Sequence, residues 1–167
     1  LLLGTKPKDF DVATNASPEE IRKLFKNARI IGRRFKIVHI RFGREIIEVT
    51  TFRANHDPKN QIADDISRRQ IKGLDSAHSK AGMILRDNVY GNIDEDAFRR
   101  DFTVNALYYT TRNFLLLDFC GGLDDIQNKE IRMIGDPTAR YKEDPVRMLR
   151  AIRFSAKLGF EIEENTK

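Results

Sequence analysis

The sequence has little of what covalent cross-links, zinc sites and membrane segments require. Its one cysteine, Cys120, excludes an internal disulfide framework and a multi-cysteine zinc site. No apolar run approaches the ~18–20 residues that a membrane-spanning helix needs, and residues 1–3 are too short for the core of a signal peptide. We therefore expect a cytoplasmic protein without a membrane partner. The three histidines show no metal-ligand spacing: His39, His56 and His78.

What the chain has in quantity is charge. Charged residues make up 33% and hydrophobic residues 40% of its 167 residues, which is typical of a globular domain of ordinary size. The net charge of +5 favours polyanionic partners, of which nucleic acid comes first. The chain begins with Leu rather than Met and ends inside a plausible element, so we read it as a fragment of a longer protein.

Two aspartates near the N-terminus, Asp9 and Asp11, form a D-x-D pair in a segment that we predict to be a strand over 8–14. Because side chains alternate along a strand, both carboxylates would lie on one face, with their α-carbons ~6.5 Å apart. Converging carboxylates suit hard cations such as Mg²⁺, and two such ions can clamp the attacking and leaving oxygens of a nucleotidyl transfer. An isolated D-x-D is weak support, because such triplets arise often by chance.

The pattern of apolar residues and turn residues predicts an α/β fold, with a small mixed sheet and flanking helices. Ser17 is the expected N-cap of a helix, with Pro18 at its first position and Glu20 completing a capping box. The other predictions are a hairpin formed by strands 35–42 and 45–52, further strands over 28–31, 113–119 and 130–134, a helix over 93–107 and a mobile loop over 54–82.

A second strong helix start lies near the C-terminus. Asp144 is the expected N-cap, Pro145 the first helical residue and Gly159 the stop. The apolar stripe of this helix is defined by four residues at helical spacing: Val146, Leu149, Ile152 and Ala156.

Four segments in order along the chain resemble a known family. They read LLLGTKPKDFDVAT at 1–14, RRDFTVNAL at 99–107, GGLDDI at 121–126 with an Ile-Arg pair at 131–132, and EDPVRMLRAIRF at 143–154. Together they resemble the head and early neck of the bacterial poly(A) polymerase and tRNA CCA-adding enzyme family, within the polymerase-β-like nucleotidyltransferases. The segments 30–39 and 85–91 are more similar to the poly(A) polymerase branch. The resemblance implies a head domain over 1–136 and the start of a helical neck over 137–167.

The resemblance implies two Mg²⁺ ions, with Mn²⁺ as an alternative, bound by Asp9 and Asp11. A third carboxylate on a neighbouring strand would complete the site of the metal on the attacking side. Glu48 is our candidate, because Ile46, Glu48 and Thr50 share one strand face. Glu45 points the other way on a regular strand and is the second choice. A solvated hairpin residue is the alternative interpretation of Glu48. In this family a glycine turn and an Arg-Asp pair upstream of the D-x-D strand hold the triphosphate, and the chain begins after that point.

The second of the four segments is implied to contact the ribose and phosphates of the nucleotide, through Arg99, Arg100, Asp101 and Asn105. An aspartate accepts hydrogen bonds from a ribose hydroxyl, and an arginine fork binds phosphate oxygens. On the predicted helix Asp101 and Asn105 would lie one turn apart on one face. The alternative interpretation is an ordinary charged helix start.

The fourth segment is implied to read the incoming base. Asp144 and Arg147, at positions i and i+3, would share one helix face. An aspartate accepts from an exocyclic amine of the base, and an arginine donates to a ring nitrogen or carbonyl. Arg150 and Arg153 would extend the positive face toward triphosphate or RNA. The alternative is an N-cap aspartate and a surface arginine in an intrahelical ion pair.

The implied activity is template-independent addition of AMP from ATP to RNA 3′ ends, with release of pyrophosphate, in RNA 3′-end processing and turnover. Arg33, Arg34 and Lys36 are candidates for contacts with the primer backbone, or else solvated surface charges. The main rival is a tRNA CCA-adding enzyme, which would use CTP as well. Weaker rivals are a non-catalytic RNA- or nucleotide-binding module and a nucleotidyltransferase that acts on a small molecule or a protein.

Overall fold

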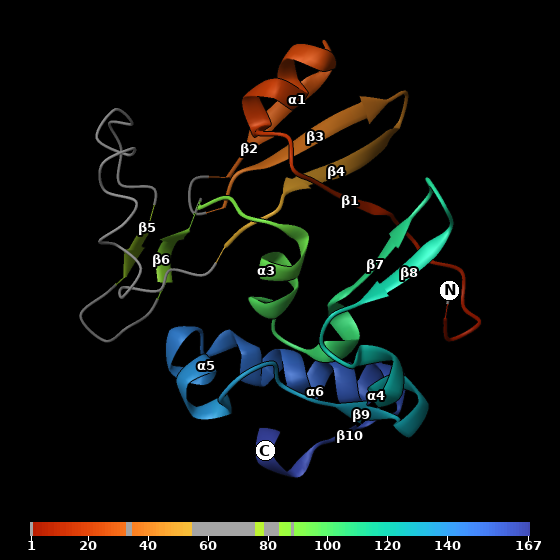
Figure 1. The fold of residues 1–167 in the computed structure, drawn as a ribbon, viewed down its shortest axis with the longest axis vertical. Helices are drawn as coiled ribbons and strands as arrows, with labels where there is room; N and C mark the ends of the chain where they lie inside the picture. The colour runs from red at the N-terminus through yellow and green to blue at the C-terminus, as the bar shows by residue number, and fades with distance from the viewer. Residues whose placement is uncertain (1, 33–34, 55–75, 79–83, 88) are drawn as a thin grey trace. The chain divides into compact units, whose positions relative to one another are not determined.

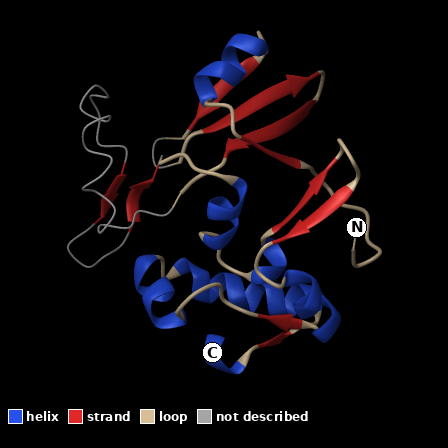
Figure 2. Cartoon of the chain, in the orientation of Figure 1, coloured by secondary structure: helices blue, strands red, loops and turns tan. Residues whose placement is uncertain are grey.

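A computed structural model describes residues 2–32, 35–54, 76–78, 84–87 and 89–167 (Figure 1). The chain divides into two compact units. The sheet unit comprises Leu1–Ser76 and Arg86–Ile93, and the C-terminal unit comprises Ala77–Leu85 and Asp94–Lys167. Helices and strands occur in both (Figure 2), so the predicted α/β class is confirmed. None of the helices in the described residues has the length and apolar character needed to span a bilayer.

The sheet unit contains a four-stranded sheet in the order β1-β4-β3-β2. β3 (Ile37–Phe42) pairs antiparallel with both β4 (Glu45–Thr51) and β2 (Ala28–Ile31), so the predicted hairpin and the strand over 28–31 are confirmed. Gly43 takes a φ of 60° at the hairpin turn, a conformation that favours glycine.

The first strand is shorter than the sequence predicts. β1 (Asp11–Thr14) runs parallel to β4, and its pairing starts at Asp11 opposite Glu48. Asp9 therefore precedes the strand, and the prediction of a strand over 8–14 is wrong for its first three residues. The parallel ladder with β4 begins only at Asp11 and Glu48, so among the described residues no strand pairing holds the segment before Asp11 in the sheet.

The helix after β1 forms as its capping signal predicts. α1 (Pro18–Leu24) begins after Ser17, whose hydroxyl accepts a hydrogen bond from the backbone N–H of Glu20 at 3.3 Å. In return, the Glu20 carboxylate accepts from the backbone N–H of Ser17 at 2.7 Å. Both bonds of a capping box are present, which fixes the start of the helix by contacts within four residues.

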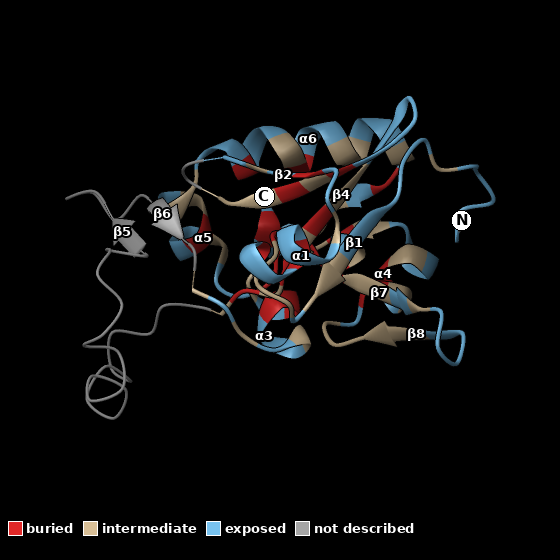
Figure 3. Ribbon diagram, turned by 90° about the horizontal axis from the view of Figure 1, so that it is seen from above, coloured by how far each residue is buried: buried red, intermediate tan, exposed pale blue. Residues whose placement is uncertain are grey.

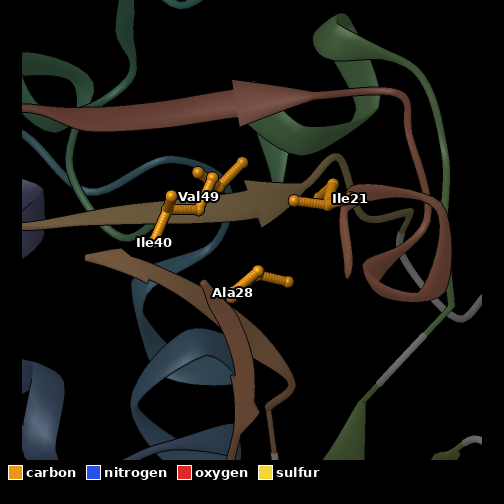
Figure 4. Packing of buried hydrophobic residues seen from close by; sticks show 5 residues of the cluster. Ile21, Ala28, Ile40 and Val49 are labelled. Atoms are coloured by element: carbon orange, nitrogen blue, oxygen red, sulfur yellow. The ribbon is translucent and has the colours of Figure 1, made fainter. Parts of the chain in front are cut away.

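One face of the sheet packs against α1. Ile21 of α1 lies in a buried cluster with Ala28, Val38, Ile40 and Val49, which come from β2, β3 and β4 (Figure 4). Strand side chains alternate, so burial of this face leaves the other residues of β1, β3 and β4 on the opposite face. That opposite face carries the polar side chains described below.

The C-terminal unit is built from short elements. Its two-stranded sheets are β7-β8, antiparallel, and β9-β10, parallel. A separate two-stranded sheet pairs β5 with β6, and the division between the two units passes through both strands. The elements that follow β4 along the chain are β5 (Ser76–His78), β6 (Ile84–Asp87), α3 (Ile93–Phe98), a 3₁₀ turn (Thr103–Asn105), β7 (Leu107–Thr110), β8 (Leu115–Asp118), α4 (Gly122–Asn128), β9 (Glu130–Ile131), α5 (Pro137–Glu143), α6 (Val146–Leu158), β10 (Glu161–Ile162) and a final 3₁₀ turn (Glu164–Thr166).

The predicted helix over 93–107 is wrong beyond Phe98. After α3 the chain turns, and Phe102 becomes fully buried and forms a β-bridge with Met133. The backbone carbonyl of Asp101 accepts from the N–H of Ile134 at 2.9 Å, and the N–H of Thr103 donates to the carbonyl of Arg132 at 3.1 Å. These bonds to a distant segment replace the hydrogen bonds that a continuous helix would need.

Other predictions hold only in part. The predicted strand over 113–119 forms as β8, whereas the one over 130–134 keeps strand pairing at β9 and a single bridge at Met133. Most of the predicted mobile loop over 54–82 lies outside the described residues. Within it, β5 is a strand, so a wholly irregular loop is wrong there.

The glycine pair at 121–122 starts a helix that the sequence did not predict. One carboxylate, Asp118, accepts hydrogen bonds from the backbone N–H groups of Cys120, Gly121, Gly122 and Leu123 at 2.9–3.1 Å. Burial raises the pKa of Asp118, but these four N–H groups outweigh it and hold the pKa below its ordinary value. A Cβ on Gly122 would lie 2.3 Å from the carbonyl oxygen of Thr103, so α4 can begin here only with glycine.

α6 begins at Val146, one residue later than predicted, with Pro145 at the N-cap position. Asp144 still contributes, because its Oδ1 accepts from the backbone N–H of Val146 at 3.3 Å. Gly159 ends the helix in the left-handed conformation, as predicted. The face that packs inside the unit contains Ala151, Phe154 and Leu158. The predicted apolar stripe is exposed instead: Val146 is 55%, Leu149 68% and Ile152 61% exposed, and Ala156 is exposed as well. Most of α6 is accordingly coloured as exposed or intermediate in Figure 3.

Candidate active site

The sheet unit places two of the predicted metal-binding carboxylates on neighbouring strands. Asp11 of β1 lies directly opposite Glu48 of β4, and directly opposite residues in a sheet point to the same face. Both lie on the face that does not pack against α1, and the Glu48 side chain is 47% exposed. Glu45 has the opposite parity along β4 and pairs with Phe42 at the end of the hairpin. The tertiary pairing therefore supports Glu48, and not Glu45, as the partner of Asp11.

A histidine that the sequence did not single out adjoins this pair. His39 of β3 is the antiparallel partner of Glu48, and its Nε2 lies 3.1 Å from Oε1 of Glu48. Arg29 of β2 is in turn the partner of His39. One line across the four strands thus reads Asp11, Glu48, His39, Arg29. Nothing in the local sequence indicates this order, because it depends on the register of three strand pairs.

Carboxylate oxygens on one exposed sheet face are the donors that a hard divalent cation prefers, so Asp11 and Glu48 fit the implied metal site. Asp9 is exposed in the segment before β1, two residues upstream of Asp11. In the described residues no group of three or more His, Cys, Asp or Glu side chains is gathered closely enough to hold a metal ion. The role of Asp9, Asp11 and Glu48 as metal ligands stays a prediction.

In the C-terminal unit, three of the predicted nucleotide-binding residues meet. Asp101 is 8% exposed, and its Oδ1 accepts from the amide of Asn105 at 3.2 Å and from the backbone N–H of Phe102 at 2.9 Å. Its other oxygen pairs with Nε of Arg150, 49 residues along the chain. Burial raises the pKa of Asp101, but Arg150, Asn105 and the backbone N–H outweigh it and hold the pKa below its ordinary value.

This cluster corrects the predicted geometry. Asp101 and Asn105 are close together, but in a turn followed by a 3₁₀ segment and not on one face of an α-helix. Arg150, whose guanidinium carbon lies 5.0 Å from the ring centroid of Phe154, is held by Asp101 on one side and an aromatic ring on the other. Its side chain remains 36% exposed, so part of it is accessible to solvent.

The other two arginines of this segment have partners within the unit. Arg100 donates to Oδ2 of Asp96 at 3.1 Å and to the Tyr108 hydroxyl at 2.9 Å. Arg99 lies 3.9 Å from Oδ1 of the same buried Asp96. Burial raises the pKa of Tyr108, as does its hydrogen bond to Asp96. A structural role is therefore present for Arg100, beside the predicted contact with a nucleotide.

Asp144 and Arg147, the pair predicted to read the base, do not share one helix face in the way that the sequence suggested. Arg147 is 8% exposed and donates to Oε2 of Glu143 at 2.9 Å and to the backbone carbonyl of Arg140 at 2.7 Å. Its ionic partner is thus Glu143 and not Asp144. Asp144 is half-buried and caps the first turn of α6. The sequence reasoning missed Glu143, although its i, i+4 spacing to Arg147 was visible.

Of the four residues predicted to contact RNA, the structure describes Lys36 and Arg153. Arg33 and Arg34 lie outside the described residues, and Lys36 has its Nζ 3.8 Å from Oε1 of Glu19. Arg153 is exposed on α6. All four assignments stay predictions.

Comparison with known proteins bears on this arrangement. Residues 1–132 match the family described as the poly A polymerase head domain. The chain belongs to this family. It is 54% identical over 166 residues to poly(A) polymerase I of Escherichia coli O6:H1, a match that covers 99% of this chain and 34% of that protein.

Further members are similar at lower identity. The CCA-adding enzyme of Lactobacillus helveticus is 35% identical over 167 residues, which are 100% of this chain and 37% of that enzyme. The crystal structure of the Bacillus stearothermophilus CCA-adding enzyme in complex with CTP matches with a TM-score of 0.73 at 29% identity, over 99% of this chain and 34% of that one. The resemblance found in the sequence is confirmed, and the chain spans about a third of the length of these relatives.

Proposed function

We propose that the protein is a template-independent polynucleotide adenylyltransferase that adds AMP from ATP to RNA 3′ ends and releases pyrophosphate. The observation that carries the proposal is the pairing of Asp11 with Glu48 on one open sheet face, in a chain 54% identical to a poly(A) polymerase I. RNA 3′-end processing and turnover in the cytoplasm is the corresponding setting.

Asp9, Asp11 and Glu48 are the residues that would hold divalent cations, Mg²⁺ or Mn²⁺. Two bound cations would lower the pKa of the primer 3′-hydroxyl and stabilise the charge of the leaving pyrophosphate. With that chemistry available, no side chain needs to serve as a general base. The protein contributes the fixed spacing of its carboxylates, because the β1–β4 register sets the positions of Asp11 and Glu48 before substrate binds.

The C-terminal unit would supply the contacts to the incoming nucleotide. Asp101, kept ionised by its neighbours, can accept from a ribose hydroxyl, while the exposed part of Arg150 can bind phosphate oxygens. Asp144 and Arg147 remain our candidates for the base edge, with Arg99, Arg100 and Asn105 for ribose and phosphate. The division into a head over 1–136 and a neck from 137 also belongs to this proposal.

Addition of CCA to tRNA is the second candidate function. The identity of 54% to a poly(A) polymerase I against 35% to a CCA-adding enzyme favours adenylate addition. The favoured reaction is therefore repeated addition of AMP to RNA, and not addition of the three nucleotides CCA.

Primer extension by the complete protein tests this choice. The reactions contain Mg²⁺ and either ATP or CTP, with a generic single-stranded RNA or a tRNA that lacks its terminal CCA. Long tails made with ATP alone on the generic RNA are the expected result. Growth that stops after a few nucleotides, requires CTP and is confined to the tRNA would assign CCA addition instead. Binding of RNA and ATP without extension would leave a non-catalytic module.

A further inference from the structure

A basic hollow lies on the same sheet face as the carboxylate pair, toward the opposite edge of the sheet. It has a volume of about 480 Å³ and is lined from β2, the turn before it, β3 and β4. Arg29, His39 and Arg41 share one face by strand pairing, and Lys26 adds a fourth basic side chain from the turn. Its size is within the range of ordinary ligand sites.

The cationic groups of this hollow are open to an anion. Lys26, Arg29 and Arg41 are exposed, and no carboxylate in the described residues pairs with any of them. Arg41 uses its Nε to donate to the carbonyl of Gly43 at 3.1 Å, which holds the side chain along the hairpin and leaves its terminal nitrogens available. An uncompensated cluster of this kind attracts phosphate.

The position of the hollow relative to the carboxylates is fixed by the strand register. Across the sheet the order is Asp11, Glu48, His39, Arg29, and each step between neighbouring strands is ~4.8 Å. Glu48 therefore lies between Asp11 and the hollow. The family resemblance places Glu48 at the metal on the side of the attacking 3′-hydroxyl, so a phosphate held by Arg29 and Arg41 would lie on the primer side of the reaction centre.

We propose that this basic hollow binds the last phosphates of the RNA primer and so holds its 3′ end beside Glu48. The inference rests on the proposed function. Two exposed apolar side chains in the lining, Ile31 and Ile46, favour a ligand that has sugar and base faces beside its phosphates over an inorganic polyphosphate. A primer presents such faces between its phosphates, and its position beside Glu48 distinguishes it from the incoming nucleotide. Arg29 and Arg41 act as positioning residues.

The test uses the complete protein with R29Q/R41Q and a matched control, R22Q/K23Q. The control removes the same two charges from exposed positions on and near the end of α1. Fluorescence anisotropy with a labelled oligoadenylate, at several KCl concentrations, gives the affinity and its salt dependence. We expect R29Q/R41Q to bind RNA about tenfold more weakly and the slope of log K against log salt to become less steep by about 1.4, since each phosphate contact on a single strand contributes ~0.7. The control should keep the wild-type slope.

Two further measurements show which primer phosphates the hollow binds and whether its ligand is RNA or ATP. Neutral methylphosphonate linkages near the primer 3′ end should weaken binding to the wild type but add little to the defect of R29Q/R41Q, whereas linkages far from that end should affect both proteins equally. The KM for ATP should not change. A raised KM for ATP with unchanged RNA affinity would mean that the hollow holds the triphosphate, and equal losses in both double variants would mean nonspecific charge; either result overturns the proposal.

Folding and catalysis do not confound this test. The single variant R29Q changes an exposed side chain outside the hairpin turn, and its salt slope should change by about half as much as that of the double variant. R29Q replaces the double variant if loss of the Arg41 contact with Gly43 disturbs the hairpin. The salt slope is an equilibrium quantity. If the salt slopes of the wild type and R29Q/R41Q differ as expected but the wild type does not extend RNA, the proposed function fails while the assignment of the hollow to RNA phosphate stands.

Discussion

The two units use their acidic residues in different ways. In the sheet unit, the Glu48 side chain is 47% exposed and Asp11 is exposed as well. In the C-terminal unit, Asp96, Asp101 and Asp125 are each at most 8% exposed and bound to arginines. Exposed carboxylates on a rigid strand can bind a ligand at little energetic cost, whereas buried paired carboxylates hold the fold together.

The exposed carboxylates of the sheet unit are therefore the ones available for chemistry. Removing a sheet-unit carboxylate should reduce turnover and leave the free energy of unfolding nearly unchanged. Removing a buried carboxylate from the C-terminal unit should lower stability first, so any loss of activity there must be measured on folded protein.

The largest effect is expected from Asp9→Ala or Asp11→Ala in the complete protein. Either change should reduce primer extension by about 10³-fold or more, because it removes a proposed metal ligand, while the melting temperature stays within about 2 °C. Extension rates and thermal melts measure the two quantities, with the exposed Asp124→Ala as the control. Turnover like the wild type in either variant would remove the two-metal assignment.

A second comparison uses the two faces of β4. Glu48→Gln should reduce extension by about 10²-fold, since it keeps the size of the side chain but removes the charge needed by a cation. Glu45→Gln, on the same strand with the opposite parity, should extend RNA at the wild-type rate. Wild-type extension by Glu48→Gln would show that Glu48 is an ordinary hairpin residue, and an equal loss in Glu45→Gln would contradict the assignment by strand parity.

In the C-terminal unit, Asp101→Asn should lower stability, in contrast to the sheet-unit variants, whose stability should hardly change. Loss of the pair with Arg150 should lower the free energy of unfolding by about 2 kcal/mol, less than for a fully buried pair because Arg150 is 36% exposed. Denaturant melts measure the change, and the exposed Asp94→Asn should alter it by less than about 0.5 kcal/mol.

The same variant has a pH signature. The pKa of Asp101 is lowered in the folded protein, so its contribution to stability is present above the unfolded carboxyl pKa of about 3.9 and is lost as the pH falls through the folded value. The stability difference between wild type and Asp101→Asn should therefore be constant near neutral pH and shrink below pH ~4. A difference that grows on acidification would contradict the assigned pairing.

The smallest effect is expected at the start of α1. Ser17→Ala removes one half of the capping box and should lower stability by about 1 kcal/mol without changing the extension rate of folded protein. The neighbouring Glu19→Gln, which breaks only a 3.8 Å surface ion pair with Lys36, should change stability by less than about 0.5 kcal/mol. A decrease in rate at full folding would link α1 to the chemistry of the opposite sheet face.

The α6 helix shows where sequence reasoning reaches its limit. Its ends follow from Asp144, Pro145 and Gly159, but the face it buries does not follow from its apolar stripe. Arg147 contacts Glu143, Arg150 contacts Asp101, and Ala151, Phe154 and Leu158 pack inside the unit. The buried face of α6 is therefore the one that finds partners on other segments, and the spacing of apolar residues along the helix does not show which face that is.

Features that depend on neighbouring residues follow from the sequence: the capping box at Ser17, the β3–β4 hairpin, the glycine stop of α6, and the four motifs that place the chain in its family. The position of Asp11 opposite Glu48, the continuation of that line by His39 and Arg29, and the contact of Asp101 with Arg150 appear only in the folded chain. Caps and turns form through bonds within a few residues, whereas strand register and buried ion pairs depend on distant segments that packing brings together.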